Sequence, residues 1–270
     1  MLDLRQIHKT FFPGTPNEVR ALCGIDLLIP EGTFAAIIGT NGSGKSTLLN
    51  AVAGTFEPDQ GEIRVDGRDI TSWPEHRRAG LIGRVFQNPF AGTAAEMTLA
   101  ENIALSMRRG CRRGLSKALR RAARDEIADR VRTLNLGLEN RLDNPIGTLS
   151  GGQRQALTLL MATWLRPRLL LLDEHTAALD PKSAAQVAEL TLTLIRREKL
   201  TALMVTHSMQ QAVQLPECII MMHQGRVVRQ YAGQEKERVR VPDLLAAFDQ
   251  VRRREQLDPA VAGLLANQYG

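Results

Sequence analysis

The residues with the clearest chemical potential in this 270-residue sequence form a glycine-rich run that ends in a lysine and two hydroxyl residues. The run consists of Gly39, Thr40, Asn41, Gly42, Ser43, Gly44, Lys45, Ser46 and Thr47. Glycines let successive backbone N–H groups turn toward phosphate oxygens, and the lysine can reach the β- and γ-phosphates of a nucleoside triphosphate. The hydroxyl of Ser46 is then available to hold Mg2+. The pattern therefore predicts a phosphate-binding loop.

The segments on both sides of this loop support the prediction. Residues Phe34–Ile38 are continuously apolar and predict a buried strand, and a helical pattern follows the loop. The positive N-terminal end of that helix would add to the attraction for phosphate. A glycine-rich turn that merely caps a helix would need neither the lysine nor the adjacent hydroxyl, so we favour the phosphate-binding interpretation.

A second candidate group is a pair of carboxylates at the end of an apolar strand. The run Arg168–Leu172 leads directly into Asp173 and Glu174. Ligands of open α/β folds bind at the carboxyl ends of the strands, so both side chains would face the phosphates. We expect Asp173 to support Mg2+ and Glu174 to orient or deprotonate water. The alternative is an acidic strand end that faces solvent, and it carries less weight beside a phosphate-binding loop.

The third candidate is a helix start formed by Leu149, Ser150, Gly151, Gly152 and Gln153. Ser150 and Gln153 have the spacing of a capping box, which alone would explain a well-capped helix. Each glycine in the first turn, however, costs about 1 kcal/mol relative to alanine. The glycines therefore favour a close approach of another group, and the exposed N–H groups of such a helix start can bind an anion.

The composition is that of an ordinary globular chain. Its 43% hydrophobic content supports a sizeable core. No apolar run reaches the roughly 18 residues of a membrane span, and Met1–Gln6 lacks the apolar core of an export signal, so we expect a cytosolic protein. Three cysteines fit neither a disulfide framework nor a zinc site. The net charge of +6 suits anionic partners but is modest for a dedicated DNA binder.

The apolar patterns predict the elements that position these groups. Residues 1 to about 85 are rich in strand patterns and predict an antiparallel layer. From Thr98 to Leu165 the spacing becomes helical and predicts a helical subdomain. Apolar strands at Leu169–Leu172 and Ala202–Val205 bracket a helical segment, which is the alternation of a parallel α/β sheet. Residues Gln234–Gly270 read as a polar tail with helical patches.

The loop, the acidic strand end and the Leu149–Gln153 run together make the chain similar to the nucleotide-binding subunits of ATP-binding-cassette (ABC) transporters. The similarity covers about Leu2 to Tyr231. It implies an α/β fold with a P-loop NTPase core on a parallel sheet, an antiparallel β layer and a helical subdomain. The parts expected are a single ATPase domain over residues 1–235, with core segments 1–88 and 166–235 around a helical subdomain 89–165, and a C-terminal tail 236–270.

The resemblance also assigns roles to residues that carry little information alone. Gln87 matches a glutamine that touches Mg2+ and links the core to the helical subdomain, and His207 matches a switch histidine that contacts the γ-phosphate. Asp180 matches the acidic end of a loop that communicates between two sites. Phe11, or alternatively Phe12, matches the aromatic residue that stacks on adenine. Without the resemblance, a strand-end glutamine, a lone histidine and an aromatic pair would be read as structural residues.

In that family the run here formed by Leu149–Gln153 faces the γ-phosphate held by the loop of a second subunit. The resemblance therefore implies a head-to-tail dimer with two ATP molecules between the protomers. The residues it assigns to catalysis are Lys45, Glu174 and His207, and those it assigns to Mg2+ are Ser46, Gln87 and Asp173. The sequence departs from the family pattern at His175 and Ala177, where the family often has proline and serine. His175 thereby places a titratable group close to the expected base.

These features imply an ATP-binding and ATP-hydrolysing subunit of a bacterial importer, with amino acids as candidate cargo. The expected partners are a second copy of the chain, an integral-membrane permease whose coupling helix docks near Gln87–Met97, and a substrate-binding protein, with no nucleic acid. The expected location is the cytoplasmic face of the bacterial inner membrane. A basic run from Arg108 to Arg124 is either a contact for anionic groups or a solvated helix face. The alternatives are a soluble ABC-type ATPase acting in translation or DNA repair, and an adaptor that binds ATP without hydrolysis.

Overall fold

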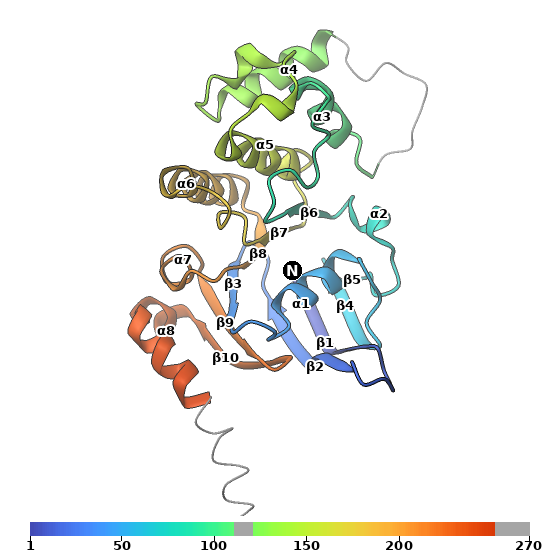
Figure 1. The fold of residues 1–270 in the computed structure, drawn as a ribbon, viewed down its shortest axis with the longest axis vertical. Helices are drawn as coiled ribbons and strands as arrows, with labels where there is room; N and C mark the ends of the chain where they lie inside the picture. The colour runs from blue at the N-terminus through green and yellow to red at the C-terminus, as the bar shows by residue number, and fades with distance from the viewer. Residues whose placement is uncertain (111–120, 252–270) are drawn as a thin grey trace, which may run out of the picture.

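Two sheets built from different parts of the chain carry the fold (Figure 1). The computed structural model describes residues 1–110 and 121–251. The first sheet is antiparallel and has the order β2-β1-β4-β5, with β1 (Leu2–Phe11), β2 (Val19–Ile29), β4 (Gln60–Val65) and β5 (Arg68–Asp69). Asp66 and Gly67 join β4 to β5 with φ values of 53° and 74°. Positive φ at both positions is the geometry of an Asp-Gly hairpin turn. The antiparallel layer predicted from the sequence is confirmed.

The second sheet has the order β10-β9-β3-β8-β7-β6. Its strands are β3 (Phe34–Gly39), β6 (Ile82–Val85), β7 (Leu169–Asp173), β8 (Thr201–Val205), β9 (Cys218–His223) and β10 (Arg226–Ala232). Strands β3 and β6 to β9 run parallel, and among the described strands of this second sheet only β10 is antiparallel to its neighbour. Strand β6 therefore forms an edge of the parallel sheet, although it lies within the first 85 residues assigned above to the antiparallel layer.

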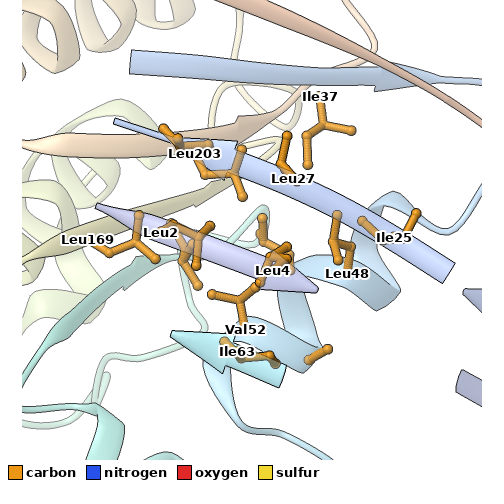
Figure 2. Close-up of a cluster of buried hydrophobic side chains, with 14 of the residues drawn as sticks. Leu2, Leu4, Ile25, Leu27, Ile37, Leu48, Val52, Ile63, Leu169 and Leu203 are labelled. Atoms are coloured by element: carbon orange, nitrogen blue, oxygen red, sulfur yellow. The ribbon is translucent and has the colours of Figure 1, made fainter. Parts of the chain in front are cut away.

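The central strands are buried on both faces, which explains their continuous apolar runs. Ile37, Leu169 and Leu203 face helix α1 (Lys45–Ala53), and they pack there with residues of the antiparallel sheet such as Leu4. Figure 2 shows Leu48 and Val52 of α1 within this cluster. The helix that follows the glycine-rich loop is thus held between the two sheets.

The other helices lie around the sheets or, like α3 (Leu99–Ser106) and α4 (Arg121–Arg132), in a group at the top of Figure 1. The others include α2 (Glu75–Arg78), α5 (Gly151–Thr163), α6 (Pro181–Glu198), α7 (Met209–Gln214) and α8 (Gly233–Arg238), with 3-10 turns at Leu138–Arg141 and Ile146–Thr148. Helices α3, α4 and α5 share an apolar cluster that includes Ile103, Ile127 and Leu157, so the predicted helical subdomain is present. Within the described ranges, no helix is long and apolar enough to cross a bilayer.

The segment after residue 235 is attached to the core as far as the structure describes it. Residues 241–251 are helical, and Leu244, Ala247 and Phe248 are buried with Tyr231. The first part of the expected polar tail therefore packs on the parallel sheet. The division into a domain over residues 1–235 and a tail over 236–270 stays a prediction.

Arg78 fixes the far end of α1. It is 1% exposed, and its guanidinium donates to the carbonyls of Ala51 at 2.7 Å, Val52 at 2.9 Å, Thr71 at 2.8 Å and Trp73 at 2.7 Å. Carbonyls at the end of a helix have no partner within the helix, so the side chain supplies donors that α1 lacks. Burial lowers the pKa of Arg78, yet the group is matched with four acceptors.

We predict that Arg78→Met lowers the free energy of unfolding by about 3 kcal/mol or more, because it leaves buried carbonyls without donors. Urea unfolding followed by circular dichroism measures the loss. Arg68→Met is the control, because Arg68 is exposed on β5. Equal stability of the two variants would contradict the capping role of Arg78.

Candidate functional site

Four strands of the parallel sheet end at one edge, and each is followed by a candidate residue or loop. The glycine-rich loop follows β3, Gln87 follows β6, Asp173 ends β7 and His207 follows β8. The pairing of Asp173 and of Ile37 with Val205 places these strand ends level with one another. Carboxyl ends of parallel strands are where open α/β sheets bind ligands. The topology thus gathers groups that lie far apart in the sequence.

The glycine-rich loop has the features of an anion cradle. Gly44 caps α1 with a φ of 94°, and no side chain caps the first turn of that helix. A Cβ at Gly39 would lie 2.4 Å from the carbonyl oxygen of Met222, and one at Gly44 would lie 2.4 Å from that of Ala21. Ser43 Oγ is buried without a hydrogen-bond partner among the described residues. These features fit a phosphate ligand. The loop offers backbone N–H groups without a side-chain cap, a backbone with positive φ, and a hydroxyl without a partner.

Lys45 lies folded over this loop. Its Nζ donates to the carbonyls of Gly39 and Thr40 at 2.9 Å each, and the residue is 5% exposed. Burial lowers the pKa of Lys45, whereas the charge of Glu174 acts in the opposite direction. A buried ammonium whose hydrogen-bond partners are neutral carbonyls is suited to receive an anion, because an anionic phosphate offers the charge that the carbonyls lack.

Glu174 and His207 are brought together across the ends of β7 and β8. Nε2 of His207 lies 2.5 Å from Oε1 of Glu174. The Glu174 side chain is 11% exposed and that of His207 is 47% exposed, so the pair lies at the mouth of the site. Glu174 has a φ of 44°, and its N–H donates to the carbonyl of Val205 at 2.9 Å. This pairing can hold a carboxylate toward a water molecule and a phosphate.

Asp173 lies beside a cation. Its Oδ2 is 3.5 Å from Nη2 of Arg84 on β6. Burial raises the pKa of Asp173, and the charge of Arg84 partly offsets this effect. Sequence reasoning missed Arg84, because nothing in its local sequence indicates which strand it lies beside.

The helix start at Ser150 has the predicted capping box. Ser150 N–H donates to Gln153 Oε1 at 3.2 Å, and Gln153 N–H donates to Ser150 Oγ at 3.3 Å. A Cβ at Gly152 would lie 2.7 Å from the Cβ of Ser183 on α6. The sequence indicated that another group approaches these glycines closely, and helix α6 is one such group. Ser150, Gly152 and Gln153 also line a cavity of about 500 Å³. Within the described part of the chain, no hydrogen bond or ion pair joins this helix start to the glycine-rich loop.

The other predicted residues have local contacts. Asp180 caps α6 by accepting from Ser183 N–H at 3.1 Å, and that contact lowers its pKa. The Phe11 ring meets that of Phe56 edge to face, with centroids 5.4 Å apart. Phe12 is 66% exposed, and Gln87 is exposed after β6. Stacking of Phe11 or Phe12 on adenine stays a prediction.

His175 is buried and does not carry a charge near neutral pH beside the expected base, Glu174. It is 1% exposed, and its Nε2 lies 2.9 Å from Oγ1 of Thr191. That hydroxyl donates to the carbonyl of Val187 at 2.7 Å, so the imidazole Nε2 is the donor to it. The Nδ1 atom is buried without a partner among the described residues. Burial lowers the pKa of His175 to about 4, so the ring is neutral near neutral pH.

The fold and the site define a nucleotide-binding ATPase with a phosphate loop on a parallel sheet. Residues 22–177 match the family described as ABC transporter. The chain is 41% identical over 251 residues to the tyrosine transport ATP-binding protein of Clostridioides difficile (strain R20291), covering 92% of this chain and 99% of that one. It is 34% identical to the lipoprotein-releasing system ATP-binding protein LolD of Ruegeria pomeroyi, covering 84% of this chain and 96% of that one.

Solved structures agree with this assignment. The dimeric ATP-binding cassette MJ0796 in a post-hydrolysis state, bound to ADP and Pi, matches with a TM-score of 0.73 at 29% identity. The match covers 86% of this chain and 98% of that one. The chain therefore belongs to the ABC transporter family and is an ATP-binding and ATP-hydrolysing cassette, as its resemblance implied.

The neutral state of His175 predicts a pH dependence of stability. Its pKa of about 4 in the folded chain lies below the ordinary value of 6.5, so the unfolded chain takes up a proton first as the pH falls. Stability is therefore complete above pH 6.5 and declines toward pH 4, by about 3 kcal/mol from this residue. Chemical unfolding without Mg2+ at several pH values measures the decline. His175→Leu should flatten it, and an unchanged pH profile in that variant would count against the assignment.

Proposed function

We propose that this cassette is the ATPase subunit of a bacterial importer that drives an integral-membrane permease. The observation that carries the proposal is the Glu174–His207 pair at the sheet edge that holds the phosphate loop. Transport is supported by the relatives, one of which is named a tyrosine transport ATP-binding protein. Another is the methionine import ATP-binding protein MetN of Escherichia coli O157:H7, 32% identical over 235 residues, which span 85% of this chain and 65% of that one. Both names favour an amino acid as the cargo.

Hydrolysis needs a positioned water and a neutralised phosphate. In our proposal Glu174 orients the water and accepts its proton, and His207 holds that carboxylate and contacts the γ-phosphate. Lys45 moves from the loop carbonyls to the β- and γ-phosphates. The loop N–H groups then balance the charge that develops on the phosphate oxygens.

The candidate magnesium residues have suitable chemistry. Ser46, Gln87 and Asp173 offer a hydroxyl, an amide and a carboxylate oxygen, and Mg2+ prefers oxygen ligands. The described residues contain no cluster of three or more His, Cys, Asp or Glu that would form a closed metal cage. Mg2+ is commonly held by one or two protein carboxylates together with water and substrate phosphates. Ser46, Gln87 and Asp173 would hold Mg2+ here, and the bound ion would supply positive charge for the phosphates during hydrolysis.

A second copy completes each site in this proposal. The Ser150 helix start has bare N–H groups, yet nothing described in its own chain connects it to the phosphate loop. A head-to-tail dimer would bring it to the γ-phosphate held by another protomer. The dimeric form of the related cassette supports this arrangement. ATP would then close the dimer, and loss of the γ-phosphate would open it.

A groove between the parallel sheet and the helical subdomain is the site that we propose for the permease. Its volume is about 520 Å³, and it is lined in part by Phe86, Leu105 and Met161. Leu105 is 55% exposed there, so an apolar helix would cover a side chain that now faces water. A peripheral position on the cytoplasmic face of the bacterial membrane and a substrate-binding protein complete the proposal.

The basic run is only partly described. Arg109 donates to the carbonyl of Met161, and Arg124 pairs with Asp143 at 2.5 Å. Residues 111–120 lie outside the described residues. Contact of this run with anionic headgroups or an acidic permease loop stays a prediction.

We predict that Glu174→Gln abolishes ATP turnover but preserves ATP binding, because the amide keeps the shape of the carboxylate and cannot accept the proton. We expect the loss to be about 100-fold or more, typical of a lost general base. Without turnover, MgATP should hold the variant as a dimer, which light scattering measures. Normal turnover in this variant would reject Glu174 as the base.

The same variant isolates the role of the Ser150 helix start. Adding Ser150→Arg to Glu174→Gln places bulk where the second nucleotide would dock. The double variant should still bind ATP at its own loop but remain a monomer. A dimer of unchanged stability would reject the head-to-tail arrangement and leave the assignment of Glu174 intact.

Purification of the tagged chain from bacterial membranes tests the transport role. We expect an integral-membrane protein to be recovered with it, and Leu105→Asp should release that partner, since it puts a charge into the apolar groove. Leu165→Asp is the control, because Leu165 is also an exposed leucine but does not line the groove. Recovery with ribosomes or DNA instead would favour the alternative of a soluble ABC-type ATPase.

A further inference from the structure

The side chain of Arg84 lies between the elements that carry two of the candidate magnesium residues. Its Nη2 donates to Oδ1 of Asn50 at 2.6 Å and lies 3.5 Å from Oδ2 of Asp173. Its Nη1 donates to Oγ1 of Thr55 at 3.3 Å. The side chain is 14% exposed, so these contacts are made largely out of water.

These contacts connect α1 to β7. Asn50 follows Ser46 by one helical turn, and residues four apart lie on the same face of a helix. Asp173 ends β7, which β8 separates from β3 in the sheet order. No strand ladder therefore joins the segment that carries Ser46 directly to the segment that carries Asp173. The guanidinium of Arg84 is a polar link between them.

We propose that Arg84 is a positioning residue for magnesium: it sets the place of the Asp173 carboxylate relative to the hydroxyl of Ser46. The inference rests on the magnesium roles proposed above for these two residues. Loss of a group that orients a metal-binding side chain typically costs about 10–100-fold in metal affinity.

The distances favour orientation over simple charge neutralisation. A separation of 3.5 Å between Arg84 and Asp173 exceeds the roughly 2.7–3.2 Å of an N–H···O bond, so it leaves the carboxylate lone pairs available. The bond to Asn50 is short, at 2.6 Å, and anchors the guanidinium to α1. A cation beside a metal site also repels Mg2+. In this proposal Arg84 strengthens magnesium binding through the geometry that it imposes, against that repulsion.

A fourth contact connects Arg84 to the segment that carries the candidate Gln87. The guanidinium lies 4.6 Å from the ring centroid of Phe86, and the carbonyl of Phe86 accepts from Gln155 Nε2 at 3.0 Å. Phe86 directly precedes Gln87, and Arg84 lines the groove proposed for the permease. Arg84 thus touches the segments that carry all three candidate magnesium residues.

Three variants test the proposal. Arg84→Met removes the guanidinium and keeps most of the apolar stem. Arg84→Lys keeps the charge but loses the planar fork that contacts two groups at once. Arg168→Met is the matched control, because Arg168 Nε also lies 3.5 Å from a carboxylate, that of Asp66, and its side chain is 59% exposed. Binding of a fluorescent ATP analogue to the purified chain is measured over a Mg2+ titration and, separately, in EDTA.

We expect Arg84→Met to raise the Mg2+ concentration needed for half-maximal binding by about tenfold or more, and to leave affinity in EDTA unchanged. Arg84→Lys should give an intermediate shift, and Arg168→Met should match the unsubstituted protein. A tighter or unchanged magnesium response in Arg84→Met would overturn the proposal, as would an equal loss of affinity with and without Mg2+.

Thermal unfolding identifies a variant that does not fold. If Arg84→Met fails to fold, Arg84→Lys and Asn50→Ala carry the test, since each weakens the link from one side. Both should raise the Mg2+ requirement, and a requirement equal to that of the unsubstituted protein in both would overturn the proposal. An unsubstituted protein that binds the analogue equally well with and without Mg2+ would reject the magnesium site itself, which is a separate failure.

Discussion

The burial of α1 between two sheets is the constraint on which the rest of the structure depends. Leu48, Leu49 and Val52 are 0% exposed and pack against strands of both sheets. Burial of each such side chain contributes about 1.5–3 kcal/mol, so α1 cannot leave its place without a large loss of stability. The glycine-rich loop is the direct continuation of this helix. Its N–H groups and Lys45 are therefore held at the sheet edge before any nucleotide arrives.

The parallel sheet supplies the other half of the site. Because β3, β7 and β8 run in one direction, the residues at their ends collect at one edge, although Lys45, Asp173 and His207 are far apart in the sequence. Pairing of Asp173 with Val205 sets the level at which Glu174 meets His207. The helix start at Ser150 does not take part in this gathering within the chain. The fold thus brings Glu174 and His207 together within one chain, whereas the Ser150 helix start has its proposed role only in a dimer.

Local chemistry made much of this predictable. The glycine-lysine pattern, the apolar run into Asp173 and the capping box at Ser150 each depend on neighbours in the sequence, and the structure contains each of these elements. Strand β6 was harder to assign, because a short apolar segment does not show which of two sheets it joins. The packing of Leu244 beyond residue 235 likewise depends on a partner, Tyr231, that the spacing of apolar residues does not identify.

The residues that sequence reasoning missed or misread depend on distant partners. Arg78 and Arg84 are single arginines whose acceptors lie on other elements, so no local pattern distinguishes them from surface arginines. His175 was read as a titratable neighbour of the base because only its position was visible. Its contact with Thr191 and its complete burial, which make it neutral, are products of the packing of α6.

The backbone of Glu174 gives a reason for its role that is independent of any relative. Its φ of 44° lies in the left-handed region. For most residues other than glycine and asparagine, this backbone conformation costs on the order of 1–2 kcal/mol of free energy. Two backbone hydrogen bonds hold this conformation. The N–H of Glu174 donates to the carbonyl of Val205, and the carbonyl of Glu174 accepts from the N–H of Ala177 at 2.9 Å. A glycine would relieve the strain but would remove the carboxylate that meets His207. The free-energy cost of this backbone conformation therefore falls at the residue whose carboxylate the turn after β7 directs toward His207. Strain of this kind is retained where the surrounding structure enforces it, and at Glu174 it agrees with the role proposed above for the carboxylate.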